Sequence, residues 1–83
     1  MIDEAWKQQV YDEAYENALA HIRRRREDAR FTVAELEGLL QSAYVNQGND
    51  WIGRGALYAI QIAATIAAYE HVLDEWAAEE DQR

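Results

Sequence analysis

The chain has 83 residues, no cysteine, no proline and a formal net charge of −8, from 16 acidic and 8 basic residues. This length allows one domain, residues 1–83, and the lack of cysteine excludes disulfide bonds and thiolate metal sites. The negative charge disfavours general binding to nucleic acid or to anionic lipid.

The composition predicts an all-α protein, because good helix formers dominate it and only four residues are glycine. The first predicted helix covers residues 3–30, where apolar residues recur at alternating steps of four and three. That stripe comprises Tyr11, Tyr15, Ala18, Ile22 and Ala29. Arg25 falls on the same stripe, so we expect its aliphatic stem to cover apolar surface while its guanidinium reaches a carboxylate. The acidic N-terminus is followed by no apolar run, so we expect no signal peptide. A chain without cysteine fits a reducing compartment, and we expect a cytoplasmic protein.

A capping box marks the start of the second helix. Thr32 is the expected N-cap, Glu35 its reciprocal partner, and Phe31 with Leu36 the hydrophobic staple. We therefore predict a helix over residues 33–46, ended by Gly48.

The third predicted helix covers residues 51–80, with Asp50 as its cap. Gly53 and Gly55 weaken its first turn, so its firm part begins near Ala56. The apolar stretch at 53–69 contains Arg54 and many weakly hydrophobic alanines, and we predict no membrane span there. Short turns between three helices favour an antiparallel up-down-up three-helix bundle with two long helices and one shorter one.

A basic cluster at the end of the first helix has two interpretations. It comprises Arg23, Arg24, Arg25, Arg26 and Arg30. In the favoured one the arginines pair with acids on the third helix, and the expected charge network is Arg25, Arg26, Glu70 and Asp74. The alternative is a phosphate-contacting patch of a nucleic-acid-binding regulator. Four consecutive arginines point around the whole helix and form no single face, which favours the structural role.

Candidate catalytic or metal-binding groups are sparse. His71 and Glu75 are spaced to share a metal ion, but a hydrogen-bonded histidine is the commoner arrangement, and we expect no metal, cofactor or catalytic residue. Trp6, Trp51 and Trp76 lie near helix ends, where they either plug the bundle or contact a partner.

The third helix has two apolar seams, and the second helix is too short to cover both. We predict that the seam formed by Leu57, Ile60, Ala64, Ala67 and His71 is the interface of a two-fold homodimer. The alternative is that the first and second helices grip the third from both sides. The sequence thus favours a small self-associating helical interaction or accessory factor without catalytic activity, of bacterial or phage type.

Overall fold

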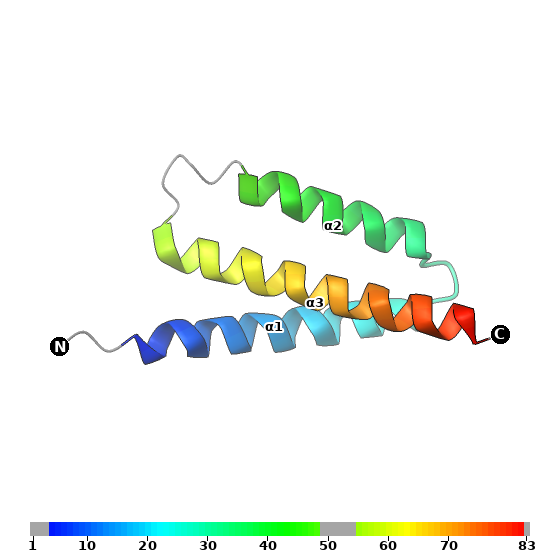
Figure 1. Ribbon diagram of the computed structural model, residues 1–83, viewed down its shortest axis with the longest axis horizontal. Coiled ribbons are helices and arrows are strands. Elements are labelled where there is room, and N and C mark those ends of the chain that lie inside the picture. The colour runs from blue at the N-terminus through cyan, green and yellow to red at the C-terminus, as the bar shows by residue number, and fades with distance from the viewer. Residues whose placement is uncertain (1–3, 49–54, 83) are drawn as a thin grey trace.

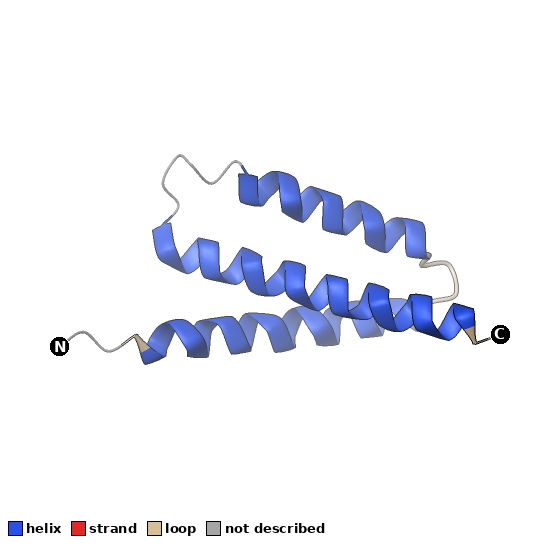
Figure 2. Cartoon of the chain, in the orientation of Figure 1, coloured by secondary structure: helices blue, strands red, loops and turns tan. Residues whose placement is uncertain are grey.

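The computed structural model describes residues 4–48 and 55–82 and contains three helices (Figure 1). They are α1 (Ala5–Arg26), α2 (Val33–Gly48) and α3 (Gly55–Asp81). These described ranges hold no strand, as Figure 2 shows, and the all-α prediction is confirmed. The predicted cap Asp50, together with Trp51, Gly53 and Arg54, lies outside the described residues.

α3 lies between the other two helices (Figure 1). It packs against both α1 and α2, whereas α1 and α2 make only marginal contact with each other. The chain runs up through α1, down through α2 and up through α3, so that α1 and α3 are parallel. This is the expected path, but the bundle is open, because α1 and α2 each pack against α3 and scarcely touch each other.

α1 ends at Arg26, so the prediction of a helix through residue 30 is wrong. The backbone N–H of Arg30 donates to the Asp28 carboxylate at 2.9 Å, and the N–H of Phe31 donates to the Asp28 carbonyl oxygen at 2.9 Å. Aspartate side chains that bond to nearby backbone groups compete with helix continuation. Asp28 therefore turns the chain toward α2.

The predicted cap of α2 is present at Thr32. Its Oγ1 accepts a hydrogen bond from the Glu35 N–H at 3.2 Å, and the helix begins at Val33. The side chains of Phe31 and Leu36 are both buried in one cluster, as a staple requires. Among the described residues the Thr32 N–H donates no reciprocal hydrogen bond to the Glu35 carboxylate, so the capping box is half formed.

The core occupies one half of the bundle. Its buried members among the described residues are Leu19, Ile22, Phe31, Leu36, Leu40, Ala43, Ala64, Ile66, Ala68 and Val72. No described residue is buried before Leu19 in α1 or before Ala64 in α3. The packed half therefore lies toward the α1–α2 turn, where all three helices contribute to one cluster.

The opposite end exposes large apolar side chains. Trp6, Val45 and Leu57 are 43%, 60% and 50% exposed. They belong to the start of α1, the end of α2 and the start of α3, which Figure 1 shows at the same end of the molecule. The radius of gyration is 14.6 Å, against about 12 Å for a compact domain of this length. The chain forms an elongated, half-closed bundle.

Candidate interaction surface and charge network

The predicted dimer seam is divided by the fold. Ala64 is fully buried within the protomer, whereas Leu57 is half exposed, Ile60 and Ala67 are partly exposed, and His71 is exposed. Because Ala64 has no exposed surface, it contributes none to contact with a partner. The seam is therefore not the single bare stripe that the sequence suggested.

A different set of small apolar residues lines the side of α3 that faces away from its neighbours. At 100° per residue, Ala56, Ile60, Ala63 and Ala67 fall on one arc of the helix. We call these four residues the outer face. All of them are partly or fully exposed. Thr65 lies on the opposite side of α3, and its hydroxyl donates to the Gln61 carbonyl oxygen at 2.9 Å.

The uncharged polar side chains of the first half of α3, Gln61 and Thr65, lie on the side of the helix next to α1. Gln61 and Thr65 line a groove between α1 and α3, whose lining residues are Ala14, Asn17, Ala18, His21, Gln61, Thr65 and Tyr69. α3 thus presents its uncharged polar groups to α1 and leaves alanines on its outer face. A helix with water on its outer side normally has the reverse arrangement.

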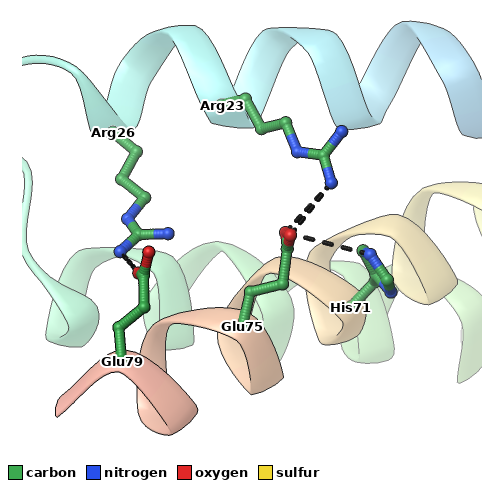
Figure 3. Close-up of polar contacts among 5 residues, drawn as sticks. All are labelled: Arg23, Arg26, His71, Glu75 and Glu79. Carbon is green, nitrogen blue, oxygen red and sulfur yellow. Dashed lines mark hydrogen bonds and ion pairs between the residues drawn. The ribbon is translucent and has the colours of Figure 1, made fainter. Parts of the chain in front are cut away.

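The end of α1 is tied to α3 by two ion pairs, which Figure 3 shows. Nη2 of Arg23 donates to both carboxylate oxygens of Glu75, at 3.1 and 3.0 Å. Arg26 pairs with Glu79, and its guanidinium lies 4.6 Å from the centre of the Trp76 ring. The Arg26 side chain is only 26% exposed, so its stem packs as well as pairs.

Of the predicted charge network, only Arg26 pairs with an acid of α3, and that acid is Glu79 and not Glu70 or Asp74. Arg25 is exposed, and its guanidinium lies 4.8 Å from the centre of the Phe31 ring. Glu70 accepts a hydrogen bond from the hydroxyl of Tyr44 at 2.5 Å. Among the described residues no ion pair involves Asp74.

The arginines pair with Glu75 and Glu79, and not with Asp74, because of which face of α3 packs against α1. Ala68 and Val72 pack against α1 in the core cluster, and Glu75 and Glu79 continue their stripe at steps of three and four. Asp74 is rotated by 100° from Glu75 and therefore points away from α1. The spacing along α3 distinguishes Glu75 and Glu79 from Asp74, but only when the face of α3 that packs against α1 is already known.

Most of the arginines in the alternative nucleic-acid patch are paired with carboxylates of the same chain. Arg23 and Arg26 are paired with α3, and Arg30 pairs with Asp28 at 3.0 Å. The hydrogen bond from Arg30 lowers the pKa of the Asp28 carboxyl, and Asp28 in turn raises the pKa of Arg30. Three of the five arginines are thus engaged within the chain.

His71 lies beside one of these pairs. Its Nε2 is 3.8 Å from Oε1 of Glu75, which also accepts from Arg23 (Figure 3). Within the described ranges no three histidine or acidic side chains gather closely enough to hold a metal ion. His21 and His71 are both exposed. The third group beside His71 and Glu75 is the Arg23 guanidinium, and its positive charge disfavours a metal cation there.

Aromatic side chains join the helices at two places, through Tyr44 and through Trp76. Tyr44 bridges α2 to α3 through Glu70, and this hydrogen bond raises the pKa of Tyr44. The Phe31 and Trp76 rings lie 6.2 Å apart between centroids, so Trp76 plugs the closed end of the bundle. Trp6, at the open end, has the Lys7 ammonium 5.8 Å from its ring centre.

Comparison of the chain with models of known families, with characterised proteins and with solved structures finds no match. α3 is long and apolar enough to cross a membrane by length and composition, with a mean hydropathy of 1.3 over its most apolar window. The core helix of a globular protein passes the same test. Only 22% of that window is buried inside the chain's own fold.

Proposed function

We propose that the chain is a cytoplasmic helical interaction factor without catalytic activity, which assembles as a homodimer through the outer face of α3. The observation that supports this proposal most is the uncovered apolar surface of the first half of α3. Leu57 and the outer face lie on a helix whose apolar window is 22% buried by its own chain. Monomeric proteins rarely leave large contiguous apolar patches in water.

The outer face is uncharged and consists of three alanines and one isoleucine. A second copy fits this surface, because residues 55–69 contain no charged side chain and two alanine-rich faces approach closely.

Analytical ultracentrifugation at ~100 μM tests the proposal, since association depends on protein concentration. We expect the wild-type chain to sediment at twice its 9.6 kDa mass. Ile60→Glu should give a monomer that stays helical by circular dichroism, because Ile60 is partly exposed in the protomer. Gln61→Glu is the matched control: it places the same charge one residue away, beside the α1 groove, and should stay dimeric.

Other outcomes point elsewhere. A wild-type monomer at this concentration would sink the homodimer. Flotation of that monomer with neutral phosphatidylcholine vesicles would indicate that α3 binds lipid instead. A salt-dependent gel shift with duplex DNA or RNA would support the nucleic-acid alternative, in which the exposed Arg24 and Arg25 contact phosphate.

A further inference from the structure

The charges of α3 are confined to one end of the helix. Residues 55–69 carry none, whereas residues 70–81 carry six carboxylates: Glu70, Asp74, Glu75, Glu79, Glu80 and Asp81. Within the part of the chain that the structure describes, arginines pair with only Glu75 and Glu79. The acidic end of α3 therefore keeps a large uncompensated negative charge.

This asymmetry discriminates between the two ways in which two copies of α3 can pair. A parallel pair would set the two acidic ends side by side, where like charges repel. An antiparallel pair overlaps the two uncharged stretches and directs the acidic ends away from each other. It also opposes the two helix dipoles, which is the favourable arrangement.

We infer, on the basis of the proposed self-association, that two copies pack their α3 helices antiparallel about a two-fold axis near Ile62. Ile62 is the midpoint of the uncharged stretch 55–69. With the axis between Gln61 and Ile62, which is also the midpoint of the outer face, Ala56 lies opposite the partner's Ala67, and Ile60 lies opposite the partner's Ala63. Each bulky isoleucine of the outer face then meets an alanine, which allows close packing without a clash.

Disulfide cross-linking tests this orientation, and the chain has no cysteine of its own to interfere. We would prepare Ala56→Cys and Ala67→Cys and oxidise each alone, and then both mixed, with copper phenanthroline. In the antiparallel pair the two copies of residue 56 are about 16 Å apart along the helix, since eleven residues separate 56 from 67. That exceeds the roughly 7 Å limit between Cα atoms that a disulfide bridges.

The expected result is that neither variant cross-links alone and that the mixture forms a covalent dimer on a non-reducing gel. Gln61→Cys, which faces the α1 groove, is the control for random collision and should not cross-link. Efficient cross-linking of each variant alone would establish a parallel pair and overturn the inference, while the homodimer itself would stand. Dimers by sedimentation without cross-links in any combination would place the interface on another surface. A wild-type monomer by sedimentation would instead mean that the proposed function fails.

Discussion

Replacing Phe31 with alanine tests whether the closed end of the bundle holds the protomer together. Phe31 is 5% exposed and contacts the Trp76 ring and the Arg25 guanidinium. A buried phenylalanine removes roughly 200 Å² from water, which at about 25 cal/mol per Å² is worth about 5 kcal/mol. Alanine retains part of this burial, so we expect Phe31→Ala to lower the free energy of unfolding by about 3–4 kcal/mol.

This loss is large for a chain of this size, whose total stability should be about 4–12 kcal/mol. Urea unfolding followed by circular dichroism measures it, at one fixed protein concentration because association shifts the midpoint. Thr32→Ala, which removes the adjacent cap, should cost only about 1 kcal/mol. Phe31→Leu keeps most of the side-chain volume but loses the aromatic contact with Trp76, so it should lower the free energy of unfolding by about 1 kcal/mol. If Phe31→Ala cost no more than Thr32→Ala, Phe31 would not close the core and our account of that end would be wrong.

Three further predictions concern two glycines and one tyrosine. Gly38 lies inside α2 with nothing within 4 Å of an added Cβ, so Gly38→Ala should raise the free energy of unfolding by about 0.5–1 kcal/mol. Gly55→Ala should lower it by about 1–2 kcal/mol, since φ of Gly55 is +83°; urea midpoints that move in the same direction for both would contradict this. Burial raises the pKa of Tyr69, with a smaller opposing effect of the Arg25 charge. The folded state therefore favours the neutral phenol, and this contribution is present below about pH 10 and is lost as the pH rises through the raised pKa. Tyr69→Phe should thus lose less stability than the wild type between about pH 8 and about pH 11 in urea titrations, and an equal loss would show that Tyr69 is not responsible.

The helices and one of their ends were predictable because local residues determine them. Thr32 and Glu35 are three residues apart, and a cap needs no information from the rest of the chain. The end of α1 was missed although its cause is equally local. The four consecutive arginines are good helix formers, so they favoured a longer helix in the prediction. The signal that ends the helix is Asp28, whose side chain bonds to the Arg30 backbone two residues on.

The charge network could not be predicted because it depends on how α1 meets α3. Arg25 lies on the apolar stripe of α1, and stripe position alone suggested that it would reach helix α3. In the fold, Ile22 packs with Ala68 and Val72, and this contact aligns Arg23 and Arg26 with the acids one turn further on. Burial of Ala64 has the same origin, since it continues the stripe of α3 that α1 covers. Which seam of an apolar helix is buried depends on its neighbours.

The composition of α3 links the open protomer to the proposed dimer. Alanine buries little area, so an alanine-rich helix adds little to a core, and α3 begins with a stretch in which no described residue before Ala64 is buried. A helix of this kind is marginal without tertiary packing. The same alanines let a second backbone approach closely, where larger side chains would hold it off. A partner on the outer face would therefore stabilise the half of α3 that the chain's own core leaves uncovered, and folding and association would be thermodynamically coupled.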